Sequence, residues 1–489
     1  MFFPLPLTPF EEYMLLDDQP AYPMSCFFML KLQGRLNTAV FQSALQKILE
    51  HHPLLTCSVQ EVKGEFFWKY IDTPLAVTRL AMDEERQFPP TKGIDLFREP
   101  ALKVSVCNEN IDPATAVLEG QTNIVFEVHH SACDAAGIVR FAEDVLCNYA
   151  FQRGFTDTQR EAVEPGLLVR RGIFGKPRNS ILRTLPKQFF GIFRAWTFLM
   201  NRVVPLTPVP IAQLSATYPR RLHVRQNTVI PAQAGIQTEE FNPDSLDPCL
   251  RRGDGKIEHA NGVATYPAIL HRDLTATETQ EIQRRAKQLG ITINDLFLCS
   301  TFEAMKNWQE QYHVTYRQSG HLRIAVPTNL RTAVDARMPA ANIVSMVFLD
   351  RRPENIQSTE TFYQGVHREM QHIKRCHLGW AFIHGLTVYR SVFGSFRKMM
   401  RPDRCWATAT VTNLGRLFAA IPLPNREGYI QIDESLELTG IEASPPVRSQ
   451  TAIGVCVMTH ADRMTINLHY DSSLLTRSDA QTLLDNVVP

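Results

Sequence analysis

Apolar and polar residues alternate along residues 124–130, and a helical pattern begins soon after them. The alternation has a period of two residues, which predicts a β-strand and places His129 and His130 on opposite faces. From residue 138 to residue 149, apolar side chains recur at spacings of three and four, which predicts a helix. Asp134 is well placed to cap that helix. The pattern therefore predicts a strand, a turn and a helix, with titratable side chains at the turn.

The rest of the first half predicts further strands and one more helix. Strands are expected at residues 27–32, 55–60, 65–70 and 101–107. Asn37 can cap a helix with apolar residues from Val40 to Leu49, and Pro53 stops it. The prolines at residues 4, 6 and 9 predict an extended N-terminal segment over residues 4–10.

The second half begins with the same order of a strand and a capped helix. Thr275 and Glu278 form a capping box for a helix that ends at Gly290, and Thr292 or Asn294 caps the next one. A final helix is expected at residues 477–487. Strands are expected at residues 265–270, 322–327, 343–349, 408–412, 452–459 and 464–470.

Prolines interrupt the pattern between residues 154 and 262, and this break suggests the domain organisation. A chain of 489 residues is expected to form two domains of about 200 residues each. We predict an N-terminal α/β domain over residues 1–185, an irregular basic connector over residues 186–262 and a C-terminal α/β domain over residues 263–489. Residues 229–237 look like an inserted low-complexity loop, for which the sequence offers no function.

Two strongly apolar segments bear on membrane contact. Residues 189–200 are too short to cross a bilayer and contain Arg194, and residues 381–400 contain His384 and several basic side chains. We interpret the first segment as a core or interdomain helix, with a membrane-surface helix as the alternative. Peripheral membrane contact and an apolar acyl channel both stay open.

Charge and cysteine usage narrow the class of protein further. Lysine and arginine occur between residues 165 and 238, but aspartate and glutamate do not. This stretch is either a solvated basic surface or a contact for an anionic partner, such as a cofactor phosphate, an acidic carrier protein or a lipid surface. Nucleic acid is disfavoured because no binding motif accompanies the charge. Ten scattered cysteines without a C-x-x-C pair and an N-terminus without a basic region indicate a cytoplasmic protein without a zinc site.

Four interpretations compete for the motif that runs from His129 to Asp134. The histidines could be structural; a metal site would need more ligands, and two side chains on opposite strand faces cannot easily share one ion. A serine hydrolase would need a nucleophile, yet no G-x-S-x-G occurs and Ser131 sits beside the histidine with poor geometry. In the fourth interpretation His130 is a general base, for which imidazole suits because its ordinary pKa lies near neutral pH.

The motif resembles the HHxxxDG signature of the coenzyme A-dependent acyltransferase superfamily. That superfamily includes chloramphenicol acetyltransferase, peptide-synthetase condensation domains, wax ester synthases and alcohol acetyltransferases. The resemblance implies that His130 is the catalytic base, that Asp134 is structural and that His129 is a bystander. One departure is visible, because Ala135 stands at the glycine of the motif and Gly137 follows two residues later.

Weaker similarities to this superfamily follow in the same order along most of the chain. His51 to Leu55 is similar to the "HPLLR" turn of this superfamily, and residues 326–331 and 341–345 look like its second-domain strands. By this resemblance Arg331 matches the arginine that pairs with the motif aspartate. Residues 412–416 resemble the "SNxG" stretch near the active site, and Tyr470 and Asp471 before the final helix are also typical. Thr412 or Asn413 is a candidate oxyanion donor, although a structural role in a tight turn with Gly415 explains them equally well.

The resemblance implies two chloramphenicol-acetyltransferase-like α/β domains in a V, with His130 in an active-site tunnel between them. The predicted function is direct transfer of an acyl group from acyl-CoA to an alcohol or an amine, with no bound cofactor, metal or acyl-enzyme. One alternative is a stand-alone condensation enzyme that uses a carrier-protein thioester. The other is a non-catalytic protein that binds an acyl thioester.

Overall fold

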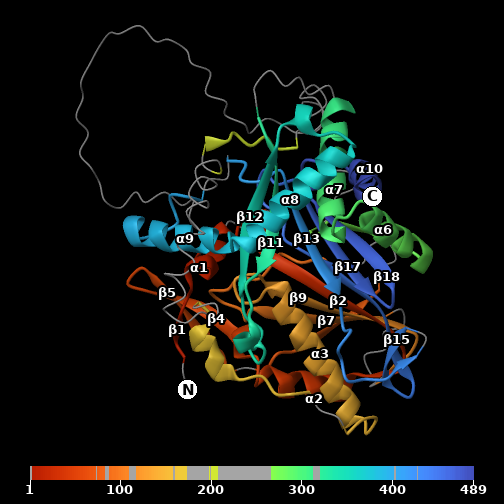
Figure 1. Ribbon diagram of the computed structural model, residues 1–489. Coiled ribbons are helices and arrows are strands. Elements are labelled where there is room, and N and C mark those ends of the chain that lie inside the picture. The colour runs from red at the N-terminus through yellow and green to blue at the C-terminus, as the bar shows by residue number, and fades with distance from the viewer. Residues whose placement is uncertain are drawn as a thin grey trace.

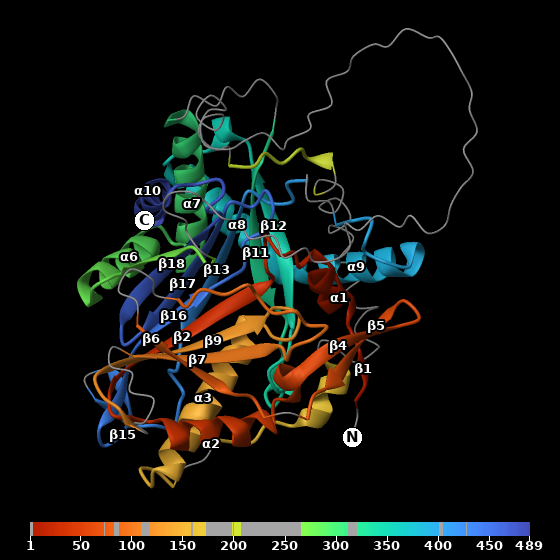
Figure 2. The same cartoon turned by 180° about the vertical axis from the view of Figure 1, so that it is seen from behind.

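Two large β-sheets covered by helices make up the body of the protein (Figures 1 and 2). The computed structural model describes residues 3–72, 74–82, 88–108, 117–157, 160–172, 198, 200–206, 266–311, 320–400, 404–426 and 428–489. This mixture of sheets and covering helices confirms the predicted α/β class. The boundaries of the two predicted domains stay a prediction.

The first sheet has seven strands in the order β14-β15-β16-β2-β9-β7-β6 within the described residues. Its strands are β2 (Ser25–Gly34), β6 (Val77–Ala81), β7 (Leu102–Asn108), β9 (Gln121–His129), β14 (Asn425–Arg426), β15 (Tyr429–Asp433) and β16 (Leu436–Ser444). All neighbours are antiparallel except β6 and β7. The predicted histidine strand is β9, which pairs with β2 on one side and β7 on the other.

The second sheet has six strands in the order β10-β18-β17-β13-β11-β12 over the same described residues. Its strands are β10 (Ile269–Asp273), β11 (Leu322–Asn329), β12 (Val344–Arg351), β13 (Ala409–Arg416), β17 (Ile453–His460) and β18 (Arg463–Tyr470). β13 runs parallel to both of its neighbours, and the other pairs are antiparallel. Two smaller ladders join β1 (Leu5–Pro6), β5 (Glu65–Tyr70) and β4 (Cys57–Val62), and β3 (Leu36–Asn37) with β8 (Val117–Leu118).

The helices bury their apolar sides against these sheets. They are α1 (Pro9–Asp17), α2 (Thr38–Leu49), α3 (Ala135–Gln152), α6 (Ala276–Gln288), α7 (Ile293–Gln311), α8 (Glu360–Arg375), α9 (Gly379–Phe393) and α10 (Arg477–Val487). α2 and α3 share a hydrophobic core with the first sheet, in which the rings of Phe126 and Phe141 meet edge to face at 5.8 Å. α6, α7, α8 and α10 share a second core with the other sheet.

The helix starts predicted from capping residues are present. Asn37 accepts hydrogen bonds from the first turn of α2, and Thr275 forms its capping box with Glu278. Of the two candidates for the start of α7, Thr292 is the cap, because its hydroxyl accepts the N–H of Asp295. Asp134 caps α3 by accepting the N–H of Gly137 at 2.9 Å. These side chains saturate N–H groups that have no partner inside the helix.

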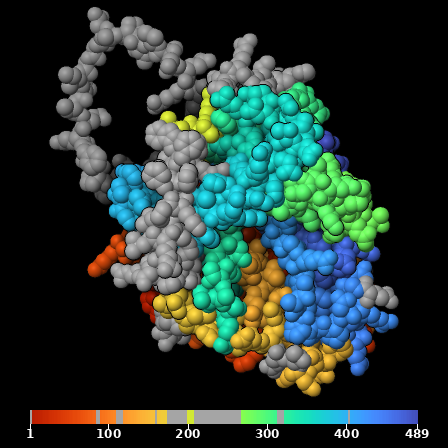
Figure 3. Space-filling view, in the orientation of Figure 1, coloured from red at the N-terminus to blue at the C-terminus, as the bar shows by residue number. Residues whose placement is uncertain are grey.

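Two segments from the second half of the chain reach the first sheet. The strands β14, β15 and β16 extend that sheet beyond β2, with β16 antiparallel to β2 along its length. The segment between β11 and β12, residues 330–343, descends beside α3 (Figures 1 and 3). The two halves therefore interlock through shared main-chain pairing, and residues 425–444 supply strands that the hydrophobic pattern did not predict.

The N-terminal prediction was wrong in part. Residues 4–10 were expected to be extended throughout, but α1 begins at Pro9. Thr8 and Glu11 form a capping box, and a proline is tolerated at the first helical position because its missing N–H would have no partner there.

Most of the predicted connector lies outside the described residues, including residues 229–237 and all of the segment 189–200 except residues 198 and 200. One basic residue just before the connector has a clear role. Arg171 is buried and donates to both carboxylate oxygens of Glu11, at 2.7 and 2.8 Å. In the described part of the chain, no helix combines the length and apolarity needed to cross a bilayer.

Candidate active site

The two histidines lie at the end of β9, in the middle of the first sheet. His129 is the last residue of the strand and His130 is the first residue of the turn. The N–H of His130 still donates to the carbonyl of Met24 at 2.7 Å. Four residues after His130, Asp134 starts α3. The strand and the helix thus fix the main chain on both sides of the turn.

One imidazole tautomer of His130 fits its surroundings. Nδ1 lies 3.1 Å from the carbonyl oxygen of Cys133. A carbonyl oxygen can only accept, so Nδ1 carries the proton and Nε2 is left with a free lone pair. Burial lowers the pKa of His130, against the opposing effects of Asp134 and of the Cys133 carbonyl. At neutral pH, His130 is therefore a neutral imidazole whose Nε2 can accept a proton.

His129 has the opposite tautomer. It is fully buried, and its Nδ1 accepts the N–H of Ser131 at 3.2 Å. Its proton therefore lies on Nε2, which is 3.8 Å from a carboxylate oxygen of Asp18. Although the two histidines are adjacent, His130 is the one of the pair that presents an unprotonated Nε2.

Ser131 does not form the nucleophile–base pair of a serine hydrolase. Its hydroxyl is buried, and within the described residues it has no hydrogen-bond partner. A serine nucleophile needs a base within hydrogen-bond reach of its hydroxyl. The same described part of the chain contains no group of three or more histidine, cysteine, aspartate or glutamate side chains that could hold a metal ion.

Asp134 connects α3 to the second half of the chain. Besides the N–H of Gly137, its carboxylate accepts from Arg331 and from the N–H of Ile343, both at 2.7 Å. Arg331 also donates to the carbonyl of Ala341 at 2.9 Å. Burial lowers the pKa of Arg331, but the charge of Asp134, the hydrogen bond to it and the neighbouring groups together outweigh burial and raise the pKa. The pairing of Asp134 with Arg331 expected from the resemblance is present. Among the described residues, no hydrogen bond joins the Asp134 carboxylate to the imidazole of His130.

Gly137 is located where α3 passes closest to the segment between β11 and β12. A β-carbon on Gly137 would lie 2.6 Å from the sulfur of Cys133 and 3.0 Å from the main-chain nitrogen of Ala341. The first contact would require the thiol of Cys133 to move, and the second would require the main chain at Ala341 to shift slightly. The close approach therefore favours glycine at residue 137, whereas Ala135 is accommodated two residues earlier.

The candidate oxyanion residues lie on β13, in the second sheet. The register of β13 with β17 is broken between Asn413 and Gly415. The side chain of Asn413 accepts the N–H of Gly415 at 2.9 Å, and Gly415 has a φ of +68°. The sequence offered a tight turn as the structural explanation, but these residues form a β-bulge inside β13, which the Asn413 side chain and the positive φ of Gly415 support. In the described residues no hydrogen bond joins Thr412 or Asn413 to His130, and their part in catalysis stays a prediction.

The sequence did not identify the role of Asn342. Its side-chain amide donates to the carbonyl of His130 at 2.7 Å. It holds the main chain of His130 from the opposite half of the molecule. The residue stands next to Ile343 in a segment already noted for its resemblance, but no local pattern shows which main-chain atom it meets.

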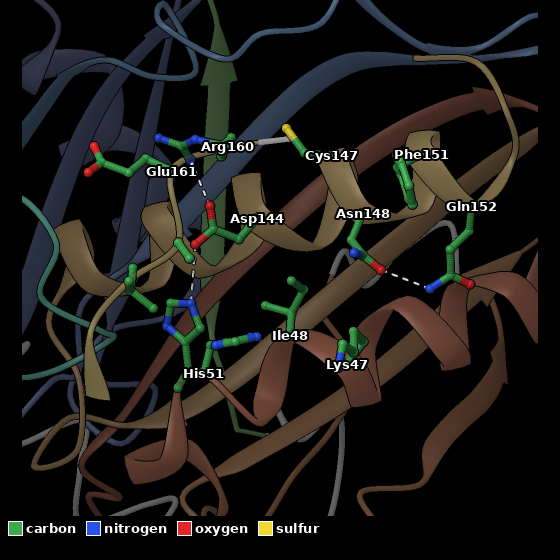
Figure 4. Close-up of a pocket in the computed structure, with 13 residues that line it drawn as sticks. Lys47, Ile48, His51, Asp144, Cys147, Asn148, Phe151, Gln152, Arg160 and Glu161 are labelled. Carbon is green, nitrogen blue, oxygen red and sulfur yellow. Dashed lines mark hydrogen bonds and ion pairs between the residues drawn. The ribbon is translucent and has the colours of Figure 1, made fainter. Parts of the chain in front are cut away.

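A separate pocket of about 360 Å³ lies between α2 and α3 (Figure 4). Its walls include Ile48, Phe151 and Asp144, with Arg160 beside Asp144. His52 also lines the pocket, where it is fully buried and contacts Asp144. Neither His130 nor Asp134 lines this pocket.

The chain shares its fold with solved condensation domains and with an acetyltransferase, and this confirms the resemblance in fold. No family model and no curated protein matches the sequence.

Three solved structures illustrate the likeness. A condensation domain of the calcium-dependent antibiotic synthetase, with a bound substrate analogue, matches with a TM-score of 0.63 and 12% identity over 100% of this chain and 95% of that chain. A trichothecene 15-O-acetyltransferase from Fusarium sporotrichioides matches with a TM-score of 0.63 and 12% identity over 99% and 93%. A mutant starter condensation domain of rhizomide synthetase, in complex with C8-CoA and Leu-SNAC, matches with a TM-score of 0.61 and 10% identity over 99% and 93%.

Proposed function

We propose that this protein is an acyltransferase that moves an acyl group from a thioester, acyl-CoA in the first instance, directly to a hydroxyl or amine of a small molecule. The observation that carries the proposal is the tautomer of His130. Its Nδ1–H is fixed on the carbonyl of Cys133, so its Nε2 is available as a base. The fold shared with acyltransferases and condensation domains supports the same reaction class.

The proposed reaction needs one base and no covalent enzyme intermediate. Nε2 of His130 takes the proton of the acceptor while the acceptor oxygen or nitrogen attacks the thioester carbonyl. The tetrahedral intermediate then expels the thiolate, and His130 returns its proton to the sulfur. The Cys133 carbonyl stabilises the transient imidazolium at Nδ1. Thr412 or Asn413 is our candidate for stabilising the oxyanion.

In the proposed reaction, donor and acceptor reach His130 from opposite sides through a tunnel between the two predicted domains. The neighbour with bound C8-CoA and Leu-SNAC supports donor and acceptor sites of this kind in this fold. A carrier-protein thioester is the alternative donor, supported by the likeness to condensation domains.

The test compares two adjacent histidine variants. We expect His130→Ala to lower turnover by about 10²–10⁴-fold, the usual contribution of a positioned general base. His129→Ala is the matched control and should change turnover far less, because its Nε2 is protonated. The assay measures thiol release from acyl-CoA and from carrier-bound thioesters, with and without alcohols and amines.

The outcomes separate the three functions. Acceptor-dependent release from acyl-CoA supports our proposal, and release from carrier-bound thioesters alone supports a condensation enzyme. Binding of the thioester without release indicates a non-catalytic protein. Near-normal turnover of a folded His130→Ala variant contradicts general-base catalysis by this residue.

We also propose that the outer side of α9 contacts an anionic lipid surface. Val388, Val392 and Phe393 are exposed on this helix, with 61%, 67% and 58% of their surface accessible. Arg397 and Lys398 are exposed just beyond its end. Apolar side chains beside basic ones are typical of helices that lie in a membrane interface.

A further inference from the structure

The segment of residues 340–343 holds both motif residues of the proposed site. Asn342 donates to the carbonyl of His130, and Ile343 donates to the carboxylate of Asp134, both at 2.7 Å. The N–H of Asp134 donates in turn to the carbonyl of Ala341 at 3.3 Å. A displacement of this segment would therefore move the main chain on which His130 and Asp134 are mounted.

His52 holds the same segment from the other side. Its Nδ1 accepts the N–H of Ala340 at 2.9 Å. Since an N–H can only donate, Nδ1 is unprotonated and the proton of His52 lies on Nε2. Nε2 then donates to Asp144 at 3.2 Å. His52 is fully buried, so these two hydrogen bonds saturate both nitrogens of a neutral ring.

Asp144 is itself fixed by basic side chains. The Nε of Arg140 donates to both carboxylate oxygens of Asp144, at 3.0 and 2.9 Å, and Arg160 lies 3.3 Å away. The ring of His52 also packs edge to face on Phe141, at 5.2 Å. Asp144 and Phe141 belong to α3, the helix that Asp134 starts. The position of the His52 ring is thus determined by α3, and the ring in turn sets the position of Ala340.

We propose that His52 is a positioning residue for acyl transfer. By accepting the N–H of Ala340 it keeps residues 340–343 in register with α3, so that Asn342 and Ile343 hold His130 and Asp134 in place. The inference rests on the proposed function of His130. A purely structural histidine would stabilise the fold without affecting the placement of His130.

Two substitutions separate the two hydrogen bonds of His52. In His52→Asn the side-chain oxygen can reach the place of Nδ1 and keep the bond from Ala340, while the bond to Asp144 is lost. In His52→Gln the side-chain amide reaches the place of Nε2 and keeps the bond to Asp144, while the bond from Ala340 is lost. Both variants remove the ring from the same buried site, so their losses of packing are matched.

We expect the two variants to differ in turnover. A small misplacement of a catalytic group can cost about 10²-fold in rate, so His52→Gln should lower kcat by about that factor. His52→Asn should stay within about threefold of the wild-type kcat. The KM for acyl-CoA should change little in either variant, because the effect is on placement of the base in the transition state. Equal kcat values for the two folded variants would overturn the inference.

A second measurement does not depend on activity. In nitrogen NMR spectra of histidine-labelled full-length protein, the Nδ1–H signal of His130 should be retained in His52→Asn and shifted or broadened in His52→Gln. An unchanged signal in His52→Gln would also overturn the inference. If His130→Ala keeps its turnover, the proposed function fails, but the NMR comparison still decides whether His52 positions His130.

Discussion

Adjacent histidines in this protein differ in chemistry because their Nδ1 atoms meet different main-chain groups. Nδ1 of His130 meets a carbonyl oxygen and must donate, whereas Nδ1 of His129 meets an N–H and must accept. The basic Nε2 is therefore found on His130. The period of the strand separates the two side chains, but the tautomers are set by the turn at residues 131–133.

Asp134 and Arg331 should be energetically coupled. Asp134→Ala leaves the partly buried guanidinium of Arg331 without its charge partner and removes the cap of α3, so we expect it to lower the free energy of unfolding by about 3 kcal/mol. The measurement is urea unfolding of Asp134→Ala, Arg331→Ala and the double variant. A coupling energy of about 1–3 kcal/mol is expected for residues in direct contact.

The matched control for this cycle is Arg337→Ala. Arg337 pairs with the exposed Glu164 on the surface, where an ion pair contributes about 0–1 kcal/mol. Strictly additive effects of Asp134→Ala and Arg331→Ala would contradict an anchoring role for the pair.

At the level of elements, the local sequence pattern predicted the bounds of a strand or helix correctly where the apolar side chains of one segment form its buried side. The strand β5 begins and ends where the alternation predicts, and α10 does the same. Residues 425–444 were missed because β14 and β15 are short and β16 gains its stability from pairing with β2, about 400 residues earlier. Such a distant partner leaves no local signal.

The exposed apolar side chains of α9 predict measurable binding of the protein to anionic lipid. Replacing Val388, Val392 and Phe393 with serine removes apolar surface worth roughly 3 kcal/mol in total on burial, so partitioning to vesicles should fall by about a hundredfold. The measurement is co-sedimentation of the full-length protein with vesicles of anionic lipid, compared with vesicles of neutral lipid.

The control variant for α9 is Val334→Ser. Val334 has 59% of its surface accessible, close to the values on α9, but it lies in the segment between β11 and β12. Equal binding by this control and the triple variant, or no preference of the wild type for anionic vesicles, would contradict a lipid contact at α9.

For the whole molecule, several buried histidines predict that acid destabilises the fold. Burial lowers the pKa of His469 to about 4 and also lowers the pKa of His52, below an ordinary value of about 6.5. Both are neutral in the fold, while the unfolded chain takes up protons as the pH falls below 6.5. The contribution of these histidines to the free energy of unfolding is therefore fully present above that pH and decreases on acidification. Burial raises the pKa of Glu127 and Glu143, which partly offsets the loss.

His469 alone should cause a measurable part of this loss of stability in acid. One proton changes stability by about 1.4 kcal/mol per pH unit, so His469 alone should lower the free energy of unfolding by about 2 kcal/mol between pH 6.5 and 5. Urea unfolding at these pH values checks it. His469→Asn keeps a donor for the carbonyl of Pro445, at 2.7 Å from Nδ1, and should reduce the pH slope by about one proton. A slope equal to that of the wild type would contradict the assignment.

The sequence by itself determined most of the elements, and its resemblance to a known superfamily selected His130 as the candidate base. Alternation and helical spacing place His130 at the end of a strand and Asp134 at the start of α3, because side-chain direction follows from a period of 2 or 3.6 residues. Resemblance to a known superfamily added the expected partner of Asp134.

The tertiary structure decided what these residues contact. Ala340, Asn342 and Ile343 meet His52, His130 and Asp134 across about 200 to 290 residues of chain, and β16 joins the first sheet across an even longer separation. Hydrogen bonds of this kind depend on where two segments are brought together and not on the local pattern of either one. The close approach to Gly137 and the link from His52 to the site arise from that packing, whereas the tautomer of His130 is set by the local turn.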